Sequence, residues 1–160
     1  MPATTAKYLG IYLNDHLAGS TGGLELTKRA AGEHQDTELG TFLAGLLEDI
    51  SEDRKVLESL MSGLGITPNP AKQAAAWAAE KAGRLKLNGE VRGTSPLTPL
   101  VELETLSLGI EGKRLMWLGL SEVPDLPLSS ERLAELVARA QQQREGVERY
   151  RREAARQALN

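Results

Sequence analysis

The chain has no cysteine among its 160 residues, and it has few aromatic residues: two Trp, three Tyr and one Phe. Without cysteine there is no disulfide framework, no thiolate metal site and no cysteine nucleophile. This absence suits a reducing compartment, so we expect a cytoplasmic location. β-branched residues are also sparse, whereas Leu and Ala dominate the apolar residues, a balance that favours packed helices over pleated sheets.

The chain also lacks an excess of charge of one sign and a long apolar run. Nineteen Lys and Arg residues face 22 Asp and Glu residues, for a net charge of -3. No strong field therefore attracts nucleic acid or an anionic membrane. No stretch approaches the ~18 uninterrupted apolar residues that a membrane span needs, and the first ten residues do not resemble an export signal. We expect neither nucleic acid nor a membrane as a partner.

What the sequence does contain is helical periodicity. Apolar residues recur at steps of three and four through most of the chain, and Ser, Thr, Asn, Asp, Pro or Gly residues stand at the breaks, where they can cap or end helices. Asn69 followed by Pro70 predicts an N-cap and first turn of a short Ala-rich helix that fades near Gly83. The four long helices are predicted over about residues 5–31, 36–63, 95–120 and 129–157.

These elements predict one all-α domain over residues 1–160. Two helical hairpins, at 5–65 and 95–157, are joined by a long crossover at 66–94 that contains the short helix. Short connections within each hairpin make its helices antiparallel neighbours. The predicted architecture is therefore a four-helix up-down bundle with one crossover.

The predicted inward faces of the first two long helices are not purely apolar. Placed on a wheel of about 100° per residue, His16 shares the stripe of the first helix with small residues that leave room around it. On the second helix Asp53 occupies the inward position between Ile50 and Leu57, and Asp49 lies at the edge one turn earlier. We expect His16 and Asp53 to face the core.

The last two helices carry acids and arginines with a common spacing of seven residues. On the third long helix Glu104 and Glu111 fill the two gaps in an apolar pattern, and on the fourth Arg144 and Arg151 share the apolar face. Because a buried charge must be paired or coordinated, we expect these acids to contact these arginines. The apolar pattern of the third helix is Leu97, Val101, Leu108, Leu115 and Leu118, and the expected buried polar network is Asp49, Asp53, Glu104, Glu111, Arg144 and Arg151.

A helical bundle with one crossover and inward carboxylates on facing helices resembles the ferritin-like superfamily. That resemblance implies a di-metal site built from one Glu on each of two helices and a Glu-x-x-His pair on each of the other two. This sequence has no Glu-x-x-His; the nearest equivalents are Glu52 to Lys55 and Glu145 to Glu148. The chain is thus interpreted as a member whose di-metal site is degenerate or lost.

Three functions follow from these residues, and the sequence gives no support for an enzyme. The first is a non-catalytic binding or interaction module in which ion pairs replace the metal site. The second is an iron- or manganese-binding protein, oxidative or of the storage type, with His16, Asp53, Glu104 and Glu111 as ligands. The third is a carrier of a small anionic or apolar molecule, held in a cavity lined by arginines and by small residues of the first helix.

The first helix also contains a group of glycines, and two apolar residues lie outside the predicted core stripes. Gly19, Gly22 and Gly23 do not follow a strand, so they are interpreted as allowing another helix to approach the first one closely. Leu26 and Met61 are apolar residues outside the main stripes. Their position is compatible with a homo-oligomer that forms through them.

Overall fold

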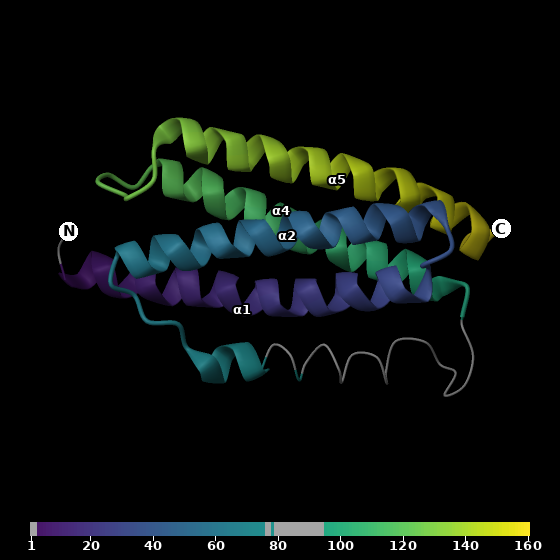
Figure 1. The fold of residues 1–160 in the computed structure, drawn as a ribbon, viewed down its shortest axis with the longest axis horizontal. Helices are drawn as coiled ribbons and strands as arrows, with labels where there is room; N and C mark the ends of the chain where they lie inside the picture. Colours follow the sequence, from purple (N-terminus) through teal and green to yellow (C-terminus); the bar gives the residue numbers. More distant parts are fainter. Residues whose placement is uncertain (1–2, 76–77, 79–94) are drawn as a thin grey trace.

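The computed structural model describes residues 3–75, 78 and 95–160, and within them it contains helices but no strand (Figure 1). The predicted all-α class is confirmed for this part of the chain. Its four long helices are α1 (Ala3–Glu33), α2 (Glu38–Gly63), α4 (Leu97–Ser121) and α5 (Ser130–Leu159). None of the described helices is long and apolar enough to cross a membrane.

Polar side chains form N-caps at three of the helices, at breaks in the sequence pattern where caps are predicted. Thr37 Oγ1 accepts a hydrogen bond from the amide of Gly40 (3.1 Å), and Ser129 Oγ accepts one from the amide of Arg132 (3.2 Å). Asn69 Oδ1 accepts from the amide of Ala71 (3.0 Å), and residues 70–75 are helical. Each cap satisfies an amide that has no partner within its helix. Residue 78 is helical as well, and the other residues of the predicted short helix after residue 75 lie outside the described part of the chain.

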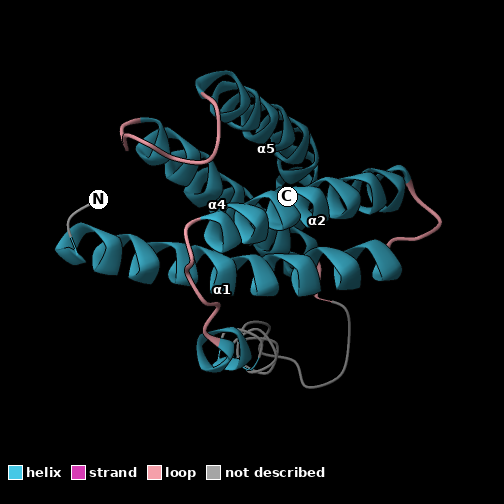
Figure 2. Ribbon diagram, turned by 60° about the vertical axis from the view of Figure 1, so that its left-hand side comes forward, coloured by secondary structure: helices cyan, strands magenta, loops and turns pink. Residues whose placement is uncertain are grey.

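The helices form two antiparallel pairs. Figure 1 shows α1 beside α2 and α4 beside α5, with α2 ending at the opposite end of the molecule from the point where α4 begins. Figure 2 shows the α4–α5 pair inclined to the α1–α2 pair. Across the pairs α1 packs against α4, whereas α2 and α5 meet only briefly.

The apolar core consists of two clusters separated along the bundle. The first contains residues 26–30 of α1, 43–50 of α2, 100–110 of α4 and 140–154 of α5. The second contains residues 9–17, 57–61, 116–120 and 133–136 of the same four helices. Between the clusters α1, α2 and α4 carry glycines and charged residues. The members of this middle layer include Gly19, Gly23, Asp53, Gly112 and Lys113.

The predicted inward face of α4 is wrong. Leu108 is 75% exposed, Leu115 is 51% exposed, and Glu104 is exposed as well. Apolar residues occur on most sides of this helix, so two stripes with the same seven-residue period could each form its buried face. Packing against α1 and α5 buries the stripe that was not predicted. The buried stripe is Leu100, Leu103, Leu106, Ile110, Met116, Trp117 and Leu120.

Leu26 and Met61 also lie elsewhere than predicted. Leu26 is 7% exposed and belongs to the first apolar cluster, and Met61 is fully buried in the second. A homo-oligomer contact through these two side chains is therefore contradicted, because contacts within the chain already cover them.

A pair of leucine substitutions on α4 tests which of its faces is the core. We expect Leu103→Ala to lower the free energy of unfolding by roughly 2 to 5 kcal/mol, because Leu103 is 2% exposed and its loss leaves a cavity. Leu108→Ala should change it by less than about 0.5 kcal/mol, since Leu108 is on the surface. Denaturant unfolding of both variants measures the difference. The reverse order of effects would contradict the assignment.

Candidate functional site

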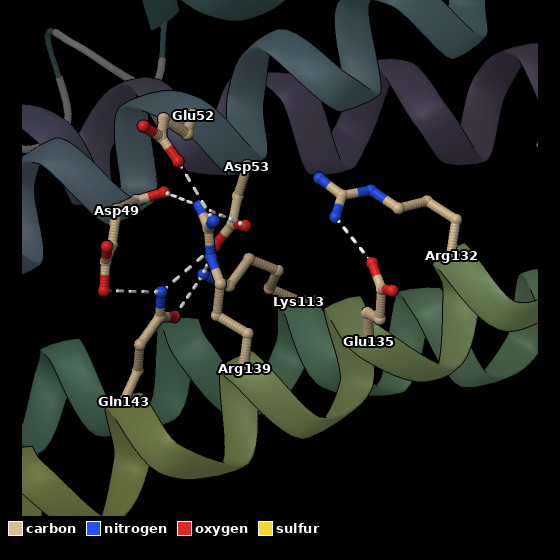
Figure 3. Close-up of polar contacts among 8 residues, drawn as sticks. All are labelled: Asp49, Glu52, Asp53, Lys113, Arg132, Glu135, Arg139 and Gln143. Carbon is tan, nitrogen blue, oxygen red and sulfur yellow. Dashed lines mark hydrogen bonds and ion pairs between the residues drawn. The ribbon is translucent and has the colours of Figure 1, made fainter.

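A buried carboxylate, Asp53, lies at the centre of the middle layer (Figure 3). The residue is only 2% exposed. Lys113 of α4 donates a hydrogen bond to its Oδ2, and Arg139 of α5 has Nη2 at 2.9 Å from its Oδ1. Lys113 also donates to Gln143 Oε1 of α5 at 2.5 Å. One carboxylate thus joins α2, α4 and α5.

Arg139 and Gln143 extend this cluster along α2. Arg139 Nη2 donates to the main-chain oxygen of Asp49 at 2.7 Å, and its Nη1 donates to Glu52 at 3.0 Å. Gln143 Nε2 donates to Asp53 Oδ2 at 3.3 Å and to Asp49 Oδ2 at 3.5 Å. These polar bonds connect α5 to α2 through the side chains of Arg139 and Gln143.

Burial and pairing oppose each other at Lys113. Burial lowers the pKa of the Lys113 ammonium below its ordinary value, and the neighbouring Asp53 carboxylate offsets only part of this shift. Since each buried ion costs several kcal/mol of solvation, the charged form depends on the geometry of its partners. The arrangement fixes the register of three helices relative to one another.

The acids of α4 do contact the arginines of α5, but at the edge of the bundle. Glu111 pairs with Arg144 at 2.7 Å, and Glu104 lies 3.5 Å from Arg151. The side chain of Glu104 is 50% exposed and that of Arg144 is 36% exposed. Their predicted place in a buried network is therefore wrong, because the α4 face that carries the glutamates points outward.

The ion pairs of Asp53 with Lys113 and Arg139, and of Glu102 with Arg29, were not predicted from the sequence. Lys113, which pairs with Asp53, fills a gap in the true core stripe of α4, between Ile110 and Trp117. Glu102 of α4 is 8% exposed and accepts a hydrogen bond from Arg29 Nη2 of α1 at 2.7 Å. Burial raises the pKa of the Glu102 carboxyl, and the Arg29 guanidinium opposes the shift. A correct choice of the α4 stripe would have found Lys113.

The four predicted metal ligands do not converge. Asp53 is engaged by Lys113 and Arg139, and the two glutamates, Glu104 and Glu111, lie at the α4–α5 edge. His16 lies on α1, with its ring edge-on to Tyr12 at a centroid distance of 4.6 Å. Among the residues that the structure describes, no three His, Asp or Glu side chains form a group that could hold a metal ion.

A cavity of about 440 Å³ lies next to the charge cluster, between α1, α2 and α4. It reaches the surface, since four of its lining residues, Asp15, Gly19, Thr105 and Gly109, are exposed. Most of its wall is apolar, and the polar side chains that line it include His16, Asp53, Arg54 and Lys113. The apolar side chains of the wall are Leu26, Ile50, Leu57, Leu106, Ile110, Met116 and Trp117.

Glycines create this space. A Cβ atom built on Gly19, Gly23, Gly109 or Gly112 would meet no other atom within 4 Å. The interpretation of the α1 glycines as points of close helix approach is therefore wrong for Gly19 and Gly23, because α4 leaves open space in front of them. The opposite situation occurs at Gly146, where a Cβ would lie 2.6 Å from the ring of Phe42.

Arg54 and His16 also line the cavity. Arg54 Nη1 donates to Thr21 Oγ1 (2.7 Å) and Ser20 Oγ (3.1 Å) of α1, and its Nη2 donates to Gln73 Oε1 (2.8 Å). Burial lowers the pKa of His16, against the opposite effect of Asp15. His16 is consequently neutral at neutral pH, and the guanidinium of Arg54 is already occupied.

The chain matches no family model, no curated protein and no solved structure.

Removing one partner of the Asp53 cluster should be costly, whereas breaking an exposed ion pair within α5 should change the stability little. We expect Asp53→Asn to lower the free energy of unfolding by roughly 3 to 5 kcal/mol, because Lys113 and Arg139 lose their counter-charge. Glu135→Gln, which breaks the exposed pair with Arg132, should cost at most about 1 kcal/mol. A double-mutant cycle with Lys113→Met measures the coupling; additive effects would argue against a shared pair.

Proposed function

We propose that the protein is a non-catalytic binding module that holds a small apolar molecule in the cavity between α1, α2 and α4. The observation that carries this proposal is a space of about 440 Å³, with apolar walls, that opens to the surface. Ligand pockets of proteins usually measure about 300 to 1,000 Å³ and are lined mainly by apolar side chains. Protein interiors without such a role are close-packed.

The glycines of the wall support this proposal. Glycine inside a helix destabilises it by roughly 0.5–1 kcal/mol relative to alanine. At Gly19, Gly23, Gly109 and Gly112 the extra methyl group of alanine would fit without contact. Stability alone would favour alanine at all four positions, so the empty volume itself is the feature to be explained. An occupant of the cavity explains it.

We further propose that the architecture is that of a ferritin-like four-helix bundle with a lost metal site. The shared direction of α2 and α4 (Figure 1) supports a single crossover between two hairpins. The mid-bundle carboxylate Asp53 is paired with the cations Lys113 and Arg139, which supports ion pairs in place of metal ions. A cytoplasmic location and a homo-oligomer stay predictions; an oligomer would use exposed residues such as Leu108 and Leu115.

Filling the cavity tests the proposal. We expect 2-isopropylnaphthalene, an apolar probe, to bind the wild-type protein in a calorimetric or NMR titration. Gly112→Leu should weaken binding by at least about tenfold, because its side chain enters the cavity. Gly45→Leu is the matched control, since Gly45 is exposed on α2, has open space around it and does not line the cavity. Absence of binding to the wild type, or equal binding by both variants, would refute the proposal.

Binding of the same probe should depend on the protonation of His16. Burial holds the pKa of this imidazole below its ordinary value of 6.5. Affinity should therefore be constant around neutral pH and fall as the pH is lowered through the His16 pKa, because the imidazolium keeps water in the cavity. Asp15, Asp53, Arg54 and Lys113 also line the cavity.

The variant His16→Gln isolates the contribution of the imidazole from that of the other wall charges. Its affinity should remain flat over the pH interval in which the wild-type affinity falls. Identical pH profiles of the two proteins would show that His16 does not control binding.

A further inference from the structure

We infer that the molecule held in the cavity is uncharged and carries one hydrogen-bond acceptor. This acceptor accepts a hydrogen bond from the indole N–H of Trp117. This inference rests on the proposed binding function and adds the chemical class of the ligand.

Two buried polar atoms of the described wall have no hydrogen-bond partner, Asp53 Oδ1 and Trp117 Nε1, and only the first has an ion-pair partner, Arg139 at 2.9 Å. Trp117 is fully buried, it lines the cavity, and its Nε1 has no hydrogen-bond partner. An indole nitrogen acts only as a donor, and buried tryptophans usually find an acceptor for it. Leaving such a donor unpaired in an apolar setting is unfavourable. A ligand with a carbonyl, ether or hydroxyl oxygen would satisfy it.

The charges of the wall argue against an ionic ligand. Lys113 already donates to Asp53 and Gln143, and the Nη atoms of Arg54 donate to Ser20, Thr21 and Gln73. No cation of the described wall is left to compensate an anion, and an anion would lie near the Asp53 carboxylate. A cationic ligand would compete with Lys113 and Arg139 for that carboxylate. Since the remaining wall is apolar, a charged group of the ligand would lose its hydration and gain no ion pair or hydrogen bond that compensates for the loss.

Three probes of similar shape test the inference. They are 2-isopropylnaphthalene, with no acceptor; 2-acetylnaphthalene, with a carbonyl oxygen; and 2-naphthoate, with a negative charge. In the wild-type protein we expect the ketone to bind about tenfold more tightly than the hydrocarbon. The naphthoate should bind at least about tenfold more weakly than the ketone. In Trp117→Phe the ketone and the hydrocarbon should bind equally.

The NMR resonance of the Trp117 indole N–H gives a second readout that needs no folded Trp117 variant. In the wild-type protein it should move to lower field with the ketone and not with the hydrocarbon. The other indole signal, from Trp77, is assigned with the variant Trp77→Phe. Thermal unfolding of Trp117→Phe checks that the loss of selectivity is not a loss of folding.

Failure of the inference is distinguishable from failure of the proposed function. If none of the probes binds, the binding function itself fails. If the ketone and hydrocarbon bind the wild-type protein equally and the indole signal does not move, the acceptor assignment is overturned and the binding function stands; Trp117 then donates to water only. Tightest binding of the naphthoate would overturn the assignment of an uncharged ligand.

Discussion

The buried carboxylate of Asp53 constrains how three of the four long helices, α2, α4 and α5, pack together. A carboxylate at 2% exposure is tolerated only because Lys113 and Arg139 reach it from two other helices. Rotation or sliding of α4 or α5 would leave at least one buried charge without its partner. The ion pairs thereby fix the relative positions of α2, α4 and α5, which apolar contacts of Leu and Ala alone would define less sharply.

The same layer of the bundle is filled on one side and open on the other. Towards α5 the side chains of Arg139 and Gln143 occupy the space around Asp53. Towards α1 the layer meets glycines, and the volume in front of Gly23 and Gly112 stays empty. The cavity therefore lies between the two apolar clusters, which follow one another along the bundle. Its volume depends on the charge cluster, because that cluster sets the position of α4.

Much of the fold can be predicted from the sequence, since helix caps and hydrophobic periodicity are local properties. Thr37, Asn69 and Ser129 cap helices as their residue types predict, and Asp53 is inward as its position between Ile50 and Leu57 indicates. The core face of α4 cannot be predicted in this way. A period of seven fits an outer and an inner apolar stripe equally well, and only packing against α1 and α5 distinguishes them. Lys113 and Glu102 were missed for that reason.

From residue types the cavity was one of three alternatives, and they could not decide between it and a filled core, because a glycine pattern has two opposite structural meanings. Glycine allows close approach at Gly146, where Phe42 fills the space of a Cβ, and it leaves a void at Gly23 and Gly112. The distinction depends on the distance between two helix axes, which a single sequence does not contain. The unpaired indole nitrogen of Trp117 is likewise visible only in three dimensions.

The most direct test of this account is a crystal structure of the protein under xenon pressure. Xenon enters stable apolar cavities and reports them by its electron density. Xenon is expected in the space lined by Gly23, Gly112 and Met116, with Asp53 still bound to Lys113. A structure in which side chains of α1 or α4 fill that space, with no xenon bound, would contradict it.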